Sequence, residues 1–241
     1  VQSVTTKLIC EREREIMDFV PREYWTVSVK LRHGKKSFEA IFVGLNGKKL
    51  ELSNKEEADR IVALSTGAEY TVKDVKIGKR SRHAPAPYTT SSMLQDASNR
   101  AGMPSKRTML CAQQLYEGVD VLGRGSIGLI TYMRTDSVRV SDEAQNAARA
   151  YIEKQYGAAY VPSAPNIYRG RNNAQDAHEA IRPTDVTLTP ELLKPYLDAG
   201  QYKLYKLIYE RFLASQMSEA VFETVTAAID TAGDEVCNYR A

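Results

Sequence analysis

Residues 79–90 read KRSRHAPAPYTT and mark the point at which the character of the sequence changes. Pro85 and Pro87 disfavour both helix and interior strand, so this stretch predicts a connector. Upstream, residues 24–31 (YWTVSVKL) alternate apolar and polar side chains as a half-buried strand does. Downstream, the patterns are helical until strand character returns at residues 221–229, VFETVTAAI. The sequence therefore predicts an α+β fold in which a mostly helical domain is inserted into a β-rich domain.

Helix and strand signals on either side of the connector define the expected elements. Expected strands cover residues 24–31, 38–43, 50–52, 69–77, 221–229 and 236–239. Expected helices cover residues 4–18, 54–64, 92–102, 104–118, 141–157 and 202–217. A Ser92–Gln95 capping box is predicted to open the third helix, and Gly102 to close it. With the helix that follows, it forms a helix-turn-helix candidate.

The distribution of charge follows the expected division of the chain. The β-rich domain is expected to comprise residues 21–78 and 219–241, and the inserted domain residues 79–218. The inserted part carries a formal charge of +5, whereas the remainder of the chain carries −2. A moderately basic domain suits a polyanionic partner such as nucleic acid.

Composition excludes several classes of protein. Apolar residues make up 43% and charged residues 26% of the 241 positions, which is typical of a folded globular protein. The most apolar stretch, residues 127–133, is far shorter than the roughly 20 residues of a membrane helix, so no membrane partner is expected. The three cysteines form no CxxC pair, so neither a zinc site nor a disulfide framework is predicted. We expect a cytoplasmic protein and, because the chain begins at Val1 without Met, a piece of a longer one.

A glycine-rich stretch at residues 123–128, GRGSIG, matches the GxGxxG pattern of dinucleotide sites. That pattern requires a strand before the glycines and a helix after them. Here a helix is expected before them, and an extended run, residues 129–131, follows. The stretch therefore predicts a turn that feeds a short strand.

Tyr132 lies in the sequence GLITYMRTDS, residues 128–137. A tyrosine at the end of a short apolar run, with a cation two positions later, can act as a phosphoryl-transfer nucleophile. A guanidinium such as that of Arg134 can hold a phosphate by paired hydrogen bonds and stabilise charge that develops in the transition state. The competing interpretation is structural: Tyr132 is a packing residue, and Arg134 forms a surface ion pair with Asp136.

His178 lies in DAHEAIRP, residues 176–183, among acidic and basic neighbours that include Arg182. A nearby carboxylate would favour the imidazolium, which could act against a phosphate. Arg169 and Arg171 lie beside Tyr168 in the sequence and form a small basic and aromatic patch. Such a patch can bind a single strand, although it is often only solvated.

Four motifs together resemble one family, the bacterial DNA topoisomerases I of type IA. They are GLITYMRTDS, DAHEAIRPT, KRTMLCAQQLYEG and the opening VQSVTTKLICEREREI, which occur in the family's order and cover most of the chain. The resemblance implies a β-rich arch domain that carries a mostly helical catalytic domain. It also implies that residues 1–20 are the remnant helix of a further, base domain.

The resemblance assigns roles to individual residues. Tyr132 matches the family's nucleophile, which attacks a phosphodiester of single-stranded DNA, forms a 5′-phosphotyrosyl bond and reseals the break without ATP. Arg134 matches the arginine that positions the scissile phosphate, and His178 matches the active-site histidine. Gln2 matches a DNA-contacting position, and Arg169, Arg171 and Arg182 are further candidates for DNA contact.

The family also has a Toprim domain that binds Mg²⁺ and supplies a catalytic glutamate, and no matching acidic cluster occurs in this sequence. We therefore expect no metal ligands here, and partners that include single-stranded DNA and the Toprim and base domains of the same protein. The isolated chain is predicted not to relax negative supercoils. The alternatives are a non-catalytic helix-turn-helix module that binds duplex DNA, and a purely structural piece.

Overall fold

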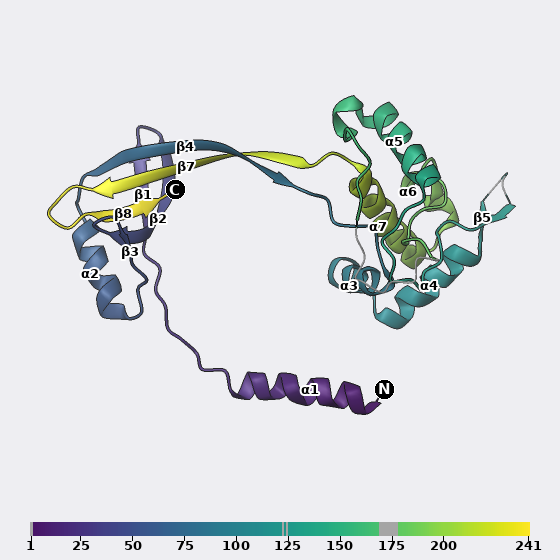
Figure 1. Cartoon of the computed structure of the whole chain (residues 1–241), viewed down its shortest axis with the longest axis horizontal. Helices are drawn as coiled ribbons and strands as arrows, with labels where there is room; N and C mark the ends of the chain where they lie inside the picture. The colour runs from purple at the N-terminus through teal and green to yellow at the C-terminus, as the bar shows by residue number, and fades with distance from the viewer. Residues whose placement is uncertain (1, 122, 124, 169–177) are drawn as a thin grey trace. The chain divides into compact units, whose positions relative to one another are not determined.

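The computed structural model describes residues 2–121, 123, 125–168 and 178–241, and of Gln2 it describes the backbone alone. The chain divides into two compact units (Figure 1). The first, here called the sheet unit, comprises Val1–Arg80 and Glu223–Ala241, and the second, the helical unit, comprises Ser81–Phe222. The fold is α+β, as predicted from the sequence.

The sheet unit contains a six-stranded sheet within the described part of the chain. Its order is β1-β2-β8-β7-β4, and β3 pairs with β2. The pairs β1–β2, β2–β3, β2–β8 and β7–β8 are antiparallel. The strands are β1 (Ser28–His33), β2 (Lys36–Leu45), β3 (Lys48–Lys49), β4 (Tyr70–Arg82), β7 (Ala220–Thr231) and β8 (Cys237–Arg240).

The two strands that enter and leave the helical unit are longer than the sequence predicted. β4 continues to Arg82, into the stretch expected to be a connector, and β7 begins at Ala220. The physical reason is that β4 and β7 are hydrogen-bonded to each other. This pairing extends both strands beyond the residues whose own β-propensity is high. Pro85 and Pro87 follow β4 after its end and do not interrupt it.

The core of the sheet unit lies between one face of the sheet and α2 (Lys55–Ser65). Phe42 and Tyr239 from the strands meet Ala58 and Ile61 from the helix in one buried cluster. Asn54 caps α2 as predicted, its side chain accepting a hydrogen bond from the backbone N–H of Glu57 at 2.8 Å.

A bulge in β2 depends on a glycine. The register of the β2–β8 pair shifts between Phe42 and Gly44. A Cβ atom at Gly44 would lie 2.2 Å from the carbonyl oxygen of Lys48, so any side chain here would displace β3. The expected strand over residues 24–31 was wrong in its first half: β1 begins at Ser28, and Trp25 makes only an isolated bridge with Leu52.

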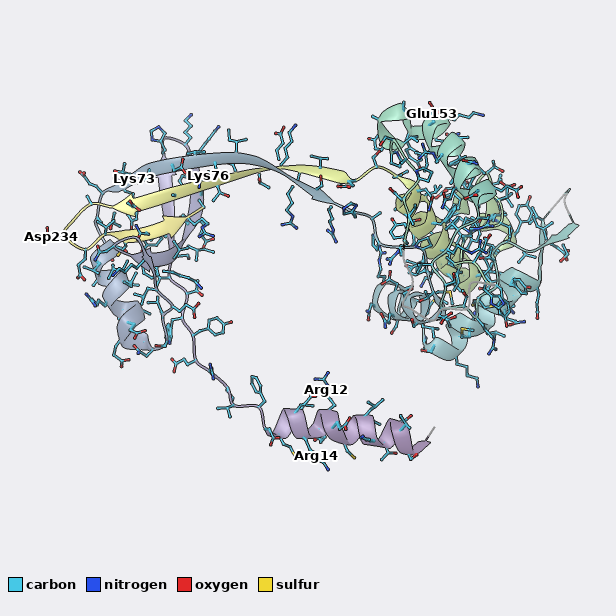
Figure 2. The ribbon with its side chains drawn as sticks, viewed as in Figure 1. Arg12, Arg14, Lys73, Lys76, Glu153 and Asp234 are labelled. Carbon is cyan, nitrogen blue, oxygen red and sulfur yellow. The ribbon has the colours of Figure 1, made fainter. Side chains whose placement is uncertain are left out.

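Helix α1 (Gln2–Met17) matches the predicted helix to within two residues at its start. Its described side chains are all exposed, including apolar ones such as Leu8 and Ile9. Its charges pair locally, for example Arg12 with Glu15 at 2.6 Å, and Figure 2 shows Arg12 and Arg14 on opposite sides of the helix.

The helical unit is built around α7, which packs against four other helices (Figure 1). Leu204, Tyr205, Ile208 and Phe212 of α7 are buried in its core. The helices of this unit are α3 (Thr90–Ala101), α4 (Ser105–Glu117), α5 (Asp142–Tyr156), α6 (Pro190–Leu193) and α7 (Ala199–Gln216). Its described residues also form two short 3₁₀ turns, η1 (Ala158–Tyr160) and η2 (Lys194–Tyr196), and an antiparallel pair of strands, β5 (Val119–Val121) and β6 (Gly125–Ile127).

The start of α3 corrects the predicted capping box. The cap is Thr89, whose side chain accepts from the backbone N–H of Ser92, and the hydroxyl of Ser92 accepts from the backbone N–H of Thr89. Ser92 is therefore the third residue of the helix, not its cap. The helix ends as predicted at Gly102, whose φ of 64° is left-handed. α3 and α4 are joined by three residues, but a DNA-binding helix-turn-helix stays a prediction.

Two negative observations concern the described residues only. No helix among them is long and apolar enough to cross a membrane. The glycines of the GxGxxG match lie around β6, and no helix follows them directly; the short strand lies within the glycine stretch, whereas the expected extended run at residues 129–131 makes only an isolated bridge, from Ile130 to Pro183.

Candidate active site

The segment 129–137, here called the strip, is irregular and bends at Thr131, Met133 and Arg134, and from residue 131 to 137 its side chains alternate in exposure. Met133, Thr135 and Ser137 are buried, whereas Tyr132 and Arg134 are exposed, as is Asp136. The strip therefore presents the predicted nucleophile and the predicted phosphate-binding cation on one surface.

The first part of the strip is anchored between α4 and the segment 180–184. The backbone N–H of Leu129 donates to the carbonyl of Leu115 at the end of α4 at 2.7 Å. The N–H of Thr131 donates to the carbonyl of Arg182 at 2.9 Å, and the Thr131 hydroxyl donates to the carbonyl of Ala180 at 2.7 Å. These bonds fix the backbone on which Tyr132 is carried.

Gly128 makes this anchoring possible. A Cβ atom at this position would lie 2.7 Å from the carbonyl oxygen of Tyr116. Because that neighbour is backbone of α4, it cannot move aside cheaply. Gly128 is therefore required by the close approach of the strip to the helix.

The second part of the strip is held by Thr90, the first residue of α3. The Thr90 hydroxyl donates to the carbonyl of Met133 at 2.7 Å and accepts from the backbone N–H of Thr135 at 2.9 Å. The backbone N–H of Thr90 donates to the carbonyl of Thr135 at 2.8 Å. One side chain and its own backbone thus pair with both residues that flank Arg134.

Two aromatic rings contact Tyr132, which is 37% exposed. The ring of Tyr116 meets it edge to face, with centroids 5.5 Å apart. The ring of His178 lies at the same centroid distance and is inclined by 31°. The structure therefore brings together Tyr132 and His178, two of the residues that sequence analysis selected.

Arg134 lies at a shallow hollow of about 390 Å³ that it lines together with Thr90, Ser91, Thr135, Asp136 and His178. The hollow joins a guanidinium, an imidazole and three hydroxyl groups, which can donate hydrogen bonds to a phosphate, with the carboxylate of Asp136. Among the described residues Arg134 forms no ion pair within 4.0 Å, so the surface pair with Asp136 that we considered is not present there.

The guanidinium of Arg182 makes its contacts with other groups of the protein. Its Nε and Nη2 atoms both lie 2.7 Å from Oε2 of Glu179, and Nη1 donates to the carbonyl of Pro183 at 3.0 Å. The side chains of Arg182 and Glu179 are only 14% and 21% exposed. This pair fixes the segment that carries His178. A role of Arg182 in DNA contact stays a prediction.

The remaining predicted DNA contacts lie outside what the structure describes. Arg169 and Arg171 belong to the undescribed residues 169–177, and the side chain of Gln2 is likewise not described. Among the described residues no group of three His, Cys, Asp or Glu side chains could hold a metal ion.

A buried tyrosine supports the far side of the site. Tyr88 forms an isolated antiparallel β-bridge with Ile181. Its hydroxyl donates a hydrogen bond to Asp96 at 2.6 Å, and the guanidinium of Arg211 lies over its ring, 4.8 Å from the centroid. Burial, reinforced by the hydrogen bond to Asp96 and its charge, raises the pKa of Tyr88 well above the ordinary value of a phenol. Tyr88 is therefore neutral, and its contacts give it a structural role.

Sequence analysis missed three residues of this site: Tyr116, Thr90 and Thr131. Tyr116 was visible as part of the motif KRTMLCAQQLYEG but had no assigned role. Thr90 sits in the pair Thr89-Thr90, where the helix cap was placed at the wrong residue. A correctly predicted cap at Thr89 would have made Thr90 the first residue of the helix. It would not have predicted the contact between Thr90 and the strip.

An exposed tyrosine, an arginine and a histidine thus meet on the surface of an α+β protein, and comparison with known proteins supplies the class. The profile described as DNA topoisomerase matches residues 1–240, so the chain belongs to the DNA topoisomerase family. The resemblance found in the motifs is confirmed.

Individual relatives agree. The chain is 48% identical over 236 residues to DNA topoisomerase 1 of Treponema pallidum (strain Nichols), a match that covers 98% of this chain and 32% of the relative. It is also similar to the structure of full-length topoisomerase I from Thermotoga maritima, with a TM-score of 0.78 and 36% identity over 100% of this chain and 37% of that one. The chain therefore spans about a third of the length of these relatives.

Proposed function

We propose that the chain is the part of a type IA DNA topoisomerase that carries the nucleophile, Tyr132. In this proposal the enzyme cleaves and rejoins single-stranded DNA and thereby relaxes negative supercoils. The observation that supports it most is the strip itself, which holds Tyr132 and Arg134 outward on fixed backbone while His178 contacts the tyrosine ring.

The chemistry assigned to these residues is a reversible phosphoryl transfer. The Tyr132 oxygen, on losing its proton, attacks the phosphorus of a DNA phosphodiester. The bond from phosphorus to the 3′ oxygen breaks, that oxygen takes up a proton, and a 5′-phosphotyrosyl bond remains. Arg134 and, when protonated, His178 stabilise the negative charge on the phosphate oxygens. Rejoining is the reverse, so no ATP is needed.

Other parts of the proposed enzyme lie on its Toprim domain. By family resemblance that domain binds Mg²⁺, which supplies charge stabilisation, and provides the acid for the leaving oxygen. The described residues of this chain offer no cluster of ligands for that metal. The 241-residue chain by itself is accordingly expected not to relax negatively supercoiled plasmid.

The test is covalent trapping. The chain is mixed with Mg²⁺ and a single-stranded oligonucleotide labelled at its 3′ end, which is the part that a 5′-phosphotyrosyl bond retains. The mixture is prepared with and without a separately produced Toprim domain and is quenched in denaturant. The proposal predicts a labelled protein band only when the Toprim domain is present, and none with Tyr132→Phe. Relaxation by the chain alone, or a band that survives in the Phe variant, contradicts it.

The same material distinguishes the two alternatives. A helix-turn-helix module would prefer duplex to single-stranded DNA and would be indifferent to Tyr132→Phe. A purely structural piece would bind neither form of DNA. Binding is measured by fluorescence anisotropy with labelled single-stranded and duplex oligonucleotides of the same sequence.

A further inference from the structure

One face of α4 is exposed along almost the whole helix. Lys106, Leu110, Gln113 and Tyr116 follow one another at intervals of three and four residues, which places them on one side of a helix. Leu110 is 53% exposed and Tyr116 is 41% exposed. This set of side chains is called the α4 face below. It spans roughly 15 Å along the helix axis at 1.5 Å per residue.

The α4 face continues the candidate active site. At the C-terminal end of the helix, the ring of Tyr116 contacts that of Tyr132. Toward the N-terminal end, Arg134 lines a second hollow, of about 790 Å³, and thus belongs to both hollows. The other residues lining this second hollow are Pro104, Lys106, Arg107, Met109, Leu110 and Gln113. The outward side of the strip therefore lies alongside the α4 face.

The side chains along this route suit a single nucleic-acid strand. Lys106 is exposed and has no ion pair within 4.0 Å among the described residues, and Arg107 pairs only loosely with Asp198, at 3.8 Å. The first turn of α4 carries no acidic residue, so its free N–H groups add to the positive potential. Leu110 with Met109 offers apolar surface to bases, and Tyr116 offers an aromatic ring on which a base can stack.

We propose that the α4 face binds the nucleotides on the 3′ side of the break, beginning at the phosphate held by Tyr132 and Arg134. The inference rests on the proposed function, which makes Tyr132 the site of attachment. In this arrangement Lys106 and Arg107 pair with phosphates of the DNA backbone. Leu110 contacts bases of the same nucleotides. The face would then retain the cleaved 5′ end while the break is open.

The experiment uses the 241-residue chain and a series of oligothymidylates labelled at the 3′ end. Strands of one, two, four and six nucleotides carry either a 5′-phosphate, which imitates the attached end, or a 5′-hydroxyl. Binding is followed by fluorescence anisotropy at low salt. The proposal predicts that affinity rises with length up to about four nucleotides and that the 5′-phosphate improves it at every length.

Variants separate the two ends of the site. Lys106→Glu and Leu110→Ala are expected to weaken binding of the four-nucleotide strand by about tenfold while the gain from the 5′-phosphate persists. Arg134→Ala should abolish that gain. Lys154→Glu, the same charge change at an exposed position of α5, is the matched control and should weaken all lengths slightly and equally. Circular dichroism melting shows whether each variant is folded.

Other results of the same binding experiments would contradict the proposal. The proposal is overturned if affinity does not depend on length, if Lys106→Glu and Lys154→Glu act alike, or if the chain binds no strand of the series. If the wild-type length dependence is absent but the Toprim domain protects Leu110 from hydrogen–deuterium exchange, the face is a protein interface instead. Failure of the proposed function is separate, because it appears as loss of the trapped Tyr132 adduct.

Discussion

The ring of His178 lies against the ring of Tyr132, with centroids 5.5 Å apart and planes inclined by 31°. The two residues belong to different segments that meet because Thr131 binds the backbone of Ala180 and Arg182. The ring contact fixes the direction of the phenol and places an imidazole beside the hollow that Arg134 lines. One side chain thus orients the phenol and also supplies an imidazole to the hollow.

His178→Ala is expected to slow formation of the Tyr132 adduct by about 100-fold when the Toprim domain is supplied, because it removes both the ring contact and the imidazole. The measurement is the single-turnover rate of the labelled protein band. His178→Phe keeps a ring without nitrogen and should lie between wild type and Ala if packing contributes. Equal rates for Ala and wild type would remove His178 from the site.

Thr90→Val is expected to lower the free energy of unfolding by about 1–2 kcal/mol, because the N–H of Thr135 loses its partner in a half-buried site. It should also reduce adduct formation, since the backbone on either side of Arg134 is released. Urea unfolding followed by circular dichroism gives the first quantity, and trapping gives the second.

Thr90→Ser is the matched control because it keeps the hydroxyl and removes only a methyl group. It should retain most of the adduct yield. If Ser and Val lose the same yield, the hydroxyl bonds to the strip do not position Arg134.

Much of the fold was accessible from the sequence because its signals are local. Asn54, Gly102 and Ser141 end or begin helices where caps were predicted, since capping depends on a few neighbouring residues. Strand limits were less accurate. β4 extends to Arg82 because it pairs with β7, a partner distant in sequence.

The site was accessible in part. Motifs selected Tyr132, Arg134 and His178, and the structure places all three at one surface. The hydroxyl of Thr90 could not be assigned, because its partners lie in a segment far along the chain. The motif also selected Arg182 as a candidate for DNA contact. The structure adds that its guanidinium pairs with Glu179, and the DNA contact itself stays a prediction.

Glu179→Gln is expected to destabilise the helical unit by about 1–3 kcal/mol, because it leaves the largely buried guanidinium of Arg182 without its counter-charge. Urea unfolding measures the loss. The double variant Glu179→Gln/Arg182→Gln should lose less than the sum of the single variants, since no unpaired charge remains. Additive losses would show that the pair contributes nothing as a unit.

Alkaline pH is expected to destabilise the helical unit through its buried tyrosines. The hydroxyl of Tyr205 is buried and donates to the carbonyl of Leu188 at 2.6 Å. Burial, followed by the charge of Asp185, raises its pKa above the ordinary value. Because the unfolded phenol releases its proton at about pH 10, the stabilising contribution is complete below that pH and is lost as pH rises further.

Tyr205→Phe should therefore cost about 1 kcal/mol at pH 7, through the unpaired Leu188 carbonyl, yet flatten the alkaline decline by up to about 1.4 kcal/mol per pH unit. Helix unfolding in urea is followed by circular dichroism between neutral and alkaline pH. Trp25, the one tryptophan of the chain, lies in the sheet unit, and its fluorescence gives an internal control that the substitution should leave unchanged. Parallel wild-type and variant curves above pH 10 would mean that Tyr205 ionises as readily in the native helical unit as in the unfolded chain, and its buried hydrogen bond would not be coupled to stability.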